Sequence, residues 1–241
     1  MITAILSALP EEQAGLSALL QNKEAVQHAG REFLRGSIHQ QQVVLALSGI
    51  GKVAAATTAT ALIERFAVQR IVFTGVAGGL GDGVQVGDLV LGTSYVQHDM
   101  DASPIFPRFV VPSLGKALLD ADKELIATLL VAAYAICKTA PGQNACKNDF
   151  RVHQGLIASG DRFVSSAVEV QVLRTALPEA LCVEMEGAAV AQVCHDYAVP
   201  FAAVRTISDR ADDTAHTDFS QFIREVAGPV AVALMSAFFT S

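Results

Sequence analysis

No long uninterrupted apolar run occurs in this chain, although 51% of its 241 residues are hydrophobic. Lys, Asp or Gly interrupts the longest apolar stretches, which fall short of the roughly 20 residues needed to span a bilayer. Residues 1–9 carry no basic segment and lead directly into Pro10, which is typical of a strand and not of a signal peptide. We therefore expect a cytoplasmic protein with no membrane partner.

The chain also lacks any block of Lys or Arg, and its formal net charge is -7. Nucleic-acid backbones and anionic membranes attract basic surfaces, so neither is expected as a partner. A small uncharged or cationic ligand fits this charge better. An acidic balance is equally the ordinary state of a cytosolic protein, so charge alone does not identify the ligand.

Cysteine is scarce: the four residues form no CxxC pair and have no histidine at a metal-ligand spacing. In a reducing compartment we expect free thiols, with Cys182 and Cys194 in the core. Cys137 and Cys146 flank a polar segment and would pair only if oxidised. Because no histidine has a zinc-like spacing, we expect neither a metal nor a cofactor.

Short β-branched runs alternate with longer Ala/Leu-rich segments, which is typical of a mostly parallel sheet covered by helices. The length suits one α/β domain over residues 1–241. Strands are predicted over residues 3–8, 32–38, 43–48, 70–74, 88–92, 155–159, 181–186 and 201–207. Helices are predicted over residues 54–66, 117–136 and 186–198, and from Pro10 with Ala14, Leu16, Leu19 and Leu20 buried.

The helix predicted over residues 186–198 has an apolar stripe and ends before Pro200. We expect the stripe to lie in the core; its members are Val190, Val193, Cys194 and Tyr197. Two loops, residues 97–115 and 139–153, interrupt the alternation without resembling interdomain linkers. The first is too apolar for a solvated loop, so we expect it to cover a pocket or to pack on a partner subunit.

Glycines follow three predicted strands, at residues 48–51, 74–80 and 159–161. Such glycines let the backbone approach a ligand, although most isolated examples are only tight turns. The Gly49/Gly51 pair lacks the third glycine of the dinucleotide fingerprint, and no GxxxxGK[ST] motif occurs. A Rossmann cofactor and a P-loop nucleotide are therefore disfavoured.

Carboxylates stand where two predicted apolar strands end, in residues 182–187 and 204–209. The carboxyl ends of strands are where an α/β enzyme exposes its chemistry, so we expect both groups to share one pocket.

Taken together and in order, these motifs resemble the methylthioadenosine/S-adenosylhomocysteine nucleosidases of the purine nucleoside phosphorylase superfamily. The matching stretches are residues 8–12 (ALPEE), 48–56 (SGIGKVAAA), 74–80 (TGVAGGL), 86–88 (VGD), 159–163 (SGDRF), 183–189 (VEMEGAA) and 204–209 (VRTISD). The resemblance covers nearly the whole chain. It implies a single nucleoside phosphorylase-like domain, a mixed twisted sheet surrounded by helices, and a homodimer whose apolar loop reaches the neighbouring pocket.

The resemblance also implies hydrolysis of the bond between adenine N9 and ribose C1′, which develops positive charge on the sugar and negative charge on the base. It assigns Asp209, helped by Ser208, to a proton or hydrogen bond at purine N7. An exposed Asp titrates near ~3.9, so Asp209 would need desolvation to carry that proton. The carboxylate that activates the attacking water matches Glu12, which without the resemblance reads as a helix N-terminal acid.

For the sugar, the resemblance assigns Glu186 to the ribose hydroxyls and Met185 to the ribose face. Glu184 would face the same side as Glu186 in an extended segment. A ribose contact and a structural ion pair are both open for Glu184. Arg205 is either its partner or a neighbour of the water site.

For the base, the resemblance assigns stacking to Phe163 and recognition of the base edge to the backbone of Val164. Ala77 and Gly78 of the glycine turn join the substrate-binding set, and Phe219 matches a residue at the end of the pocket that receives the 5′ substituent. Val76 stands where the family commonly has serine, which removes a hydroxyl from the water or ribose site. The identity of the 5′ substituent stays open among methylthio, homocysteinyl and deoxyadenosyl groups.

Three alternatives remain: a phosphate-dependent purine nucleoside phosphorylase, a futalosine-type nucleosidase and a non-catalytic nucleoside-binding module. Phosphate binding needs cationic donors, whereas residues 7–12 and 71–75 provide carboxylates and a phenyl ring where arginines are expected. Mere binding needs no water-activating carboxylate. We therefore favour the nucleosidase.

Overall fold

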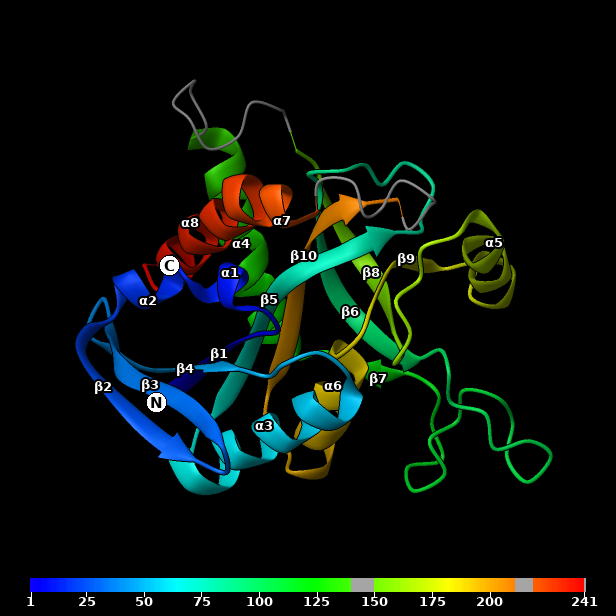
Figure 1. Ribbon diagram of the computed structural model, residues 1–241, viewed down its shortest axis with the longest axis horizontal. Coiled ribbons are helices and arrows are strands. Elements are labelled where there is room, and N and C mark those ends of the chain that lie inside the picture. Colours follow the sequence, from blue (N-terminus) through cyan, green and yellow to red (C-terminus); the bar gives the residue numbers. More distant parts are fainter. Residues whose placement is uncertain (140–149, 211–218, 241) are drawn as a thin grey trace.

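One twisted sheet organises the chain in the computed structural model, which describes residues 1–139, 150–210 and 219–240 (Figure 1). Its strands are β1 (Ile2–Ser7), β2 (Gln21–His28), β3 (Arg31–Ile38), β4 (Gln41–Leu47), β5 (Arg70–Gly79), β6 (Leu89–Gln97), β7 (Leu119–Asp120), β8 (Val152–Ser159), β9 (Ala180–Glu184) and β10 (Phe201–Asp209). They lie in the order β10-β6-β8-β9-β5-β1-β4-β3-β2, with β7 on β6. The mixed α/β fold predicted from the sequence is confirmed.

The sheet closes on itself through β10, which pairs in parallel with β5 and antiparallel with β6. Strands β5, β9, β8, β6 and β10 thereby form a ring. Strand β1 also runs parallel to β5. The carboxyl ends of β1, β5 and β10 therefore meet at one edge, where α/β folds place their ligands.

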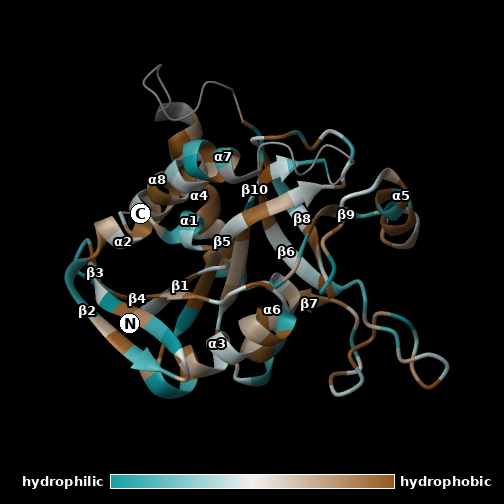
Figure 2. Cartoon of the chain, viewed as in Figure 1, coloured by the Kyte–Doolittle hydropathy of each residue, from teal (hydrophilic) through white to brown (hydrophobic). Residues whose placement is uncertain are grey.

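Helices cover both faces of the sheet. They are α1 (Pro10–Gln13), α2 (Leu16–Leu19), α3 (Lys52–Phe66), α4 (Lys123–Thr139), α5 (Ala167–Ala176), α6 (Gly187–Asp196), α7 (Phe219–Phe222), a π-helical turn (Ile223–Ala227) and α8 (Gly228–Phe238). Helices α3 and α6 pack together over one apolar cluster, and α4 and α8 over a second. Figure 2 shows apolar residues along α4, α8 and the central strands. Among the described residues, no helix has the length and apolar character to cross a membrane.

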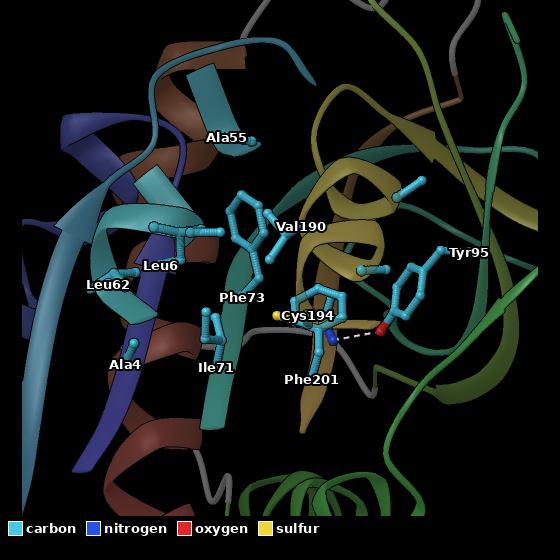
Figure 3. Packing of buried hydrophobic residues seen from close by; sticks show 14 of the residues in the cluster. Ala4, Leu6, Ala55, Leu62, Ile71, Phe73, Tyr95, Val190, Cys194 and Phe201 are labelled. Carbon is cyan, nitrogen blue, oxygen red and sulfur yellow. Dashed lines mark hydrogen bonds between the residues drawn. The ribbon is translucent and has the colours of Figure 1, made fainter. Parts of the chain in front are cut away.

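The core between the sheet and α3 and α6 is made of fully buried side chains, including Leu62, Phe73 and Val190 (Figure 3). Burying side chains of this kind stabilises the fold by about 1.5–3 kcal/mol each. The buried Tyr95 hydroxyl accepts the N–H of Ala203 at 2.7 Å, so its polar atom is satisfied. Cys182 and Cys194 are buried free thiols, as predicted, whereas Cys146 lies outside the described residues.

Three local predictions were wrong. The segment after Pro10 forms two short helices, and Ala14 is exposed. Between them, a Cβ added at Gly15 would lie 2.5 Å from Cγ2 of Val232, so the chain turns where it approaches α8. The helix predicted over residues 117–136 begins only at Lys123, because residues 119–120 pair with β6. Tyr197 is 42% exposed and lies outside the core.

Candidate active site

Glu12 occupies the third position of α1, just beyond the end of β1. Pro10 starts this helix with its fixed φ. The carboxylate accepts the N–H groups of Ala8 at 2.9 Å and Leu9 at 3.0 Å on Oε2, and of Val76 at 3.0 Å on Oε1. Only 3% of Glu12 is exposed. Burial raises the pKa of Glu12, although the backbone hydrogen bonds and Arg205 act in the opposite direction.

Glycine at position 75 makes room for this carboxylate. A Cβ at Gly75 would lie 3.0 Å from Oε1 of Glu12 and 3.4 Å from Nη1 of Arg205. Real side chains rarely tolerate such an approach without displacing a neighbour. The glycines of the TGVAGGL turn therefore leave room for the Glu12 side chain and also let the backbone lie close to the cavity.

Glu184, on the cavity wall, forms a buried ion pair with Arg205 behind it, with Arg205 Nη2 2.7 Å from Glu184 Oε2. The Arg205 guanidinium also lies 4.2 Å from the centre of the Phe73 ring and donates to the Phe73 carbonyl at 3.2 Å. Burial would lower the pKa of Arg205, but the charge of Glu184 raises it overall. This arrangement favours the structural ion pair over a direct ribose contact for Glu184.

The same Glu184 carboxylate holds the start of α6. It accepts the N–H groups of Glu186 at 3.1 Å and Gly187 at 2.8 Å, together with the hydroxyl of Ser159. A buried charge that is paired and hydrogen-bonded in this way keeps its surroundings rigid. Glu184 thus fixes the backbone from which Glu186 projects.

Glu186 is a buried acid on the cavity wall, only 6% exposed. Its Oε1 accepts the N–H of Gly51 at 2.8 Å, which joins α6 to the turn between β4 and α3. Burial, with the nearby charge of Glu184, raises the pKa of Glu186 to about 8. A carboxyl of this kind is suited to hydrogen bonds with ligand hydroxyls.

Asp209 and Ser208 end β10, where its register with β5 shifts between Ile207 and Asp209. A bulge re-aims side chains, and both residues are half-buried on the cavity wall. The Ser208 hydroxyl donates to Asp209 Oδ2 at 2.6 Å. Hydrogen-bonded in this way, the Asp209 carboxyl is held at the strand end.

These groups line one cavity of about 170 Å³. Ten of the twelve predicted site residues line it: Glu12, Ala77, Gly78, Phe163, Val164, Glu184, Met185, Glu186, Ser208 and Asp209. Arg205 lies behind them against Glu184, and the side chain of Phe219 is outside the described structure. The described residues contain no cluster of three or more His, Cys, Asp or Glu side chains able to hold a metal ion.

Val76, which was predicted to leave the water or ribose site without a hydroxyl, also lines the cavity. Five further lining residues had no role predicted from the sequence: Ala8, Leu9, Ile50, Arg162 and Val183. Ile50 is 59% exposed and lies between Gly49 and Gly51. The one sequence feature that could have predicted Ile50 as a cavity residue is its position as an apolar side chain between two glycines. Arg162 gave no such signal, since its pairing with Glu169 depends on how the loop after β8 folds.

Comparisons with known proteins show the family of the chain. A family model described as the phosphorylase superfamily matches residues 3–240. The 5′-methylthioadenosine/S-adenosylhomocysteine nucleosidase of Anoxybacillus flavithermus is 38% identical over 228 residues, or 94% of this chain and 93% of that protein. Its counterpart from Neisseria meningitidis, solved with methylthio-immucillin-A, is 36% identical with a TM-score of 0.89 and covers 98% of this chain and 97% of that one. The futalosine hydrolase of Helicobacter pylori is 33% identical with a TM-score of 0.87, over 98% and 97% of the two chains.

Proposed function

The chain belongs to the phosphorylase superfamily, and from that premise we propose that it is a nucleosidase that hydrolyses 5′-methylthioadenosine and S-adenosylhomocysteine to release adenine. The observation that carries the proposal is the buried Glu12 carboxylate, held by three backbone N–H groups in the same cavity as Glu186 and Asp209. Mere binding of a nucleoside requires no such acid. 5′-Deoxyadenosine is a further candidate substrate.

In this mechanism Glu12 accepts a proton from water while the water oxygen bonds to ribose C1′ and the bond from C1′ to adenine N9 breaks. The pKa of Glu12, raised by burial, makes it a stronger base than an exposed glutamate. Asp209 gives a proton or a strong hydrogen bond to N7 of the departing base, assisted by Ser208. The products are adenine and the free 5-substituted ribose.

The remaining contacts position the two halves of the nucleoside. Glu186 accepts from the ribose hydroxyls, with Met185 against the sugar face. In its ionised form, Glu186 stabilises the transition state more than the ground state, because positive charge develops on the ribose ring. Phe163 stacks on adenine, while the backbones of Val164, Ala77 and Gly78 meet the base; Phe219 is assigned to the 5′ end.

Phosphorolysis is the less favourable reading because the cavity offers little to bind phosphate. Among the described residues lining it, the cationic one is Arg162, whose side chain is 77% exposed and already paired with Glu169. Arg205 is engaged by Glu184. Phosphate sites typically supply bidentate arginine or lysine donors, and a buried carboxylate such as Glu12 would repel the anion.

Adenine release from methylthioadenosine, measured in phosphate-free buffer and again with added phosphate, tests the proposal. We expect equal release in both buffers, with free methylthioribose as the sugar product. Release only with phosphate, with a sugar phosphate as product, would make the protein a phosphorylase.

A futalosine-type substrate is the second candidate, since the Helicobacter pylori futalosine hydrolase is nearly as similar in structure. The ratio of kcat/KM for methylthioadenosine and futalosine separates the two. We expect methylthioadenosine to be preferred, because the Anoxybacillus and Neisseria relatives are more similar in sequence.

We further propose a homodimer. The loop between β6 and β7 projects from the body of the molecule (Figure 1) and exposes Ile105 (80%) and Phe106 (39%). Ile50, Val53 and Val168 are exposed apolar residues as well. A projecting loop that exposes apolar side chains is a candidate interface. Light scattering on the purified protein should give twice the mass of 25.3 kDa.

A further inference from the structure

Three loops around the cavity are joined by a ring of hydrogen bonds that includes no substrate-binding residue. Lys52 Nζ lies 2.6 Å from Asp99 Oδ1. The other Asp99 oxygen, Oδ2, accepts the N–H of Asp161 at 2.9 Å, and Asp161 Oδ1 accepts the N–H of Lys52 at 2.7 Å. The ring thus links the start of α3, the segment after β6 and the loop after β8.

This ring lies directly beside the hydrogen bond that holds Glu186. Gly51, whose N–H donates to Glu186 Oε1, immediately precedes Lys52. Gly51 has φ +95°, and a Cβ there would lie 3.0 Å from Asp161 Oδ1. The turn is therefore confined between Glu186 on one side and Asp161 on the other, and few other residues would fit its backbone.

Further contacts hold the ring in place. Lys52 Nζ also donates to Gln97 Oε1 at 3.2 Å, and the Gln97 amide donates to Gln192 on α6 at 2.7 Å. Buried His98 packs against Gly160, which leaves no room for a side chain there. The Lys52 side chain is 17% exposed and that of Asp99 31%. A partly shielded pair in a network holds geometry better than an isolated surface pair.

Glu186 immediately precedes α6, so the network contacts its surroundings in two places. Gly51 donates directly to its carboxylate, and Gln97 holds Gln192 of the helix that follows it. We propose that Asp99 and Lys52 are positioning residues, which hold the Gly51 amide against Glu186 so that its carboxylate meets the ribose hydroxyls. This inference rests on the proposed nucleosidase function. Neither residue lines the cavity, so each acts through Glu186 and not on the substrate.

A double-mutant cycle tests it, with kcat/KM for adenine release from methylthioadenosine as the readout. Asp99→Asn should lower kcat/KM about 10- to 100-fold in the wild-type background, but less than about threefold in the Glu186→Gln background, because its effect passes through that carboxylate. Lys52→Met should behave like Asp99→Asn. Lys52→Arg, which keeps a cation for Asp99, should retain most of the activity.

Glu24→Gln serves as the matched control, since it removes a carboxylate from the exposed pair that Glu24 forms with Arg35 at 4.0 Å. It should leave kcat/KM unchanged. Wild-type activity in Asp99→Asn and Lys52→Met would overturn the inference. So would an equal loss in both backgrounds, which would mean a general structural effect. A wild-type chain that releases no adenine would instead contradict the proposed function.

Discussion

Glu12 and Glu186 are both buried acids, yet their surroundings favour different tasks. Three backbone N–H groups favour the charged form of Glu12, whereas Glu186 lies near Glu184 and has its pKa raised to about 8. Pairs of acids whose environments differ in this way commonly divide roles in catalysis. Glu12 is the better candidate for proton abstraction, and Glu186 for hydrogen bonding to the sugar.

The pH dependence of kcat/KM follows from the buried acids. Glu12 must be ionised to accept a proton, and burial raises its pKa above the ordinary value of 4.5. As pH falls through that raised pKa, Glu12 is protonated and activity is lost. The midpoint of the acid limb, measured with methylthioadenosine between pH 4 and 9, should therefore lie above 4.5. A midpoint at or below 4.5 would exclude Glu12 as the base.

Asp209→Asn tests activation of the leaving group. An amide cannot supply the proton that the departing adenine needs, so kcat should fall by about 10²–10³-fold. Ser208→Ala, which removes only the hydroxyl that donates to Asp209, should cost about tenfold. Stopped-time assays of adenine release give both values. Wild-type kcat in Asp209→Asn would show that another group protonates the base.

The sequence identified the cavity residues well where a carboxylate or glycine ends an apolar strand. Glu186 and Asp209 were found in this way, whereas Glu12 was assigned through the family resemblance; all three line the cavity. The partner of Glu184 could not be chosen from sequence because it depends on which strands become neighbours. Only the folded sheet shows that Arg205 of β10 reaches Glu184 at the end of β9.

At the scale of elements, strand β5 combines packing and catalysis through its glycines. Gly75→Ala should displace the Glu12 carboxylate and lower kcat about tenfold or more, since a small displacement of a catalytic group costs much rate. The matched control is Gly155→Ala in β8, whose Cβ would have the side chain of Leu181 as its nearest neighbour. It should lower the unfolding temperature without changing kcat. Unchanged kcat in Gly75→Ala would contradict the inference that a side chain at position 75 displaces the Glu12 carboxylate.

Several elements were not predictable from local pattern. Strand β2 is an edge strand whose residues are mostly exposed, so it lacks the apolar alternation that indicates strands. Two residues of β7 pair with β6 inside a segment with helical periodicity. The helix after β1 breaks at Gly15 because α8, which is far away in the sequence, approaches there. Tertiary contacts override local preference in each case.

For the whole molecule, the site is built at some expense of stability. Glu186 is ionised in the folded protein only above a pH of about 8, whereas in the unfolded chain it ionises near 4.5. The folded state therefore loses stability as pH rises between those values. Glu186→Gln removes this cost and should raise stability at pH 9 by about 5 kcal/mol, or ~10–20 °C in Tm, with little effect at pH 5. If calorimetry showed the same change in Tm at both pH values, the loss of stability would not come from ionisation of Glu186.

The central claim is that the fold brings a buried carboxylate to an adenine nucleoside in order to activate water. Glu12→Gln tests it most directly, with kcat, the Kd of an uncleavable carbon-linked nucleoside analogue and Tm measured on one preparation, and exposed Glu11→Gln as the control. We predict that kcat falls by about 10²–10⁴-fold, while the Kd changes less than about threefold and Glu11→Gln behaves as wild type. Near-normal turnover in folded Glu12→Gln would contradict the account.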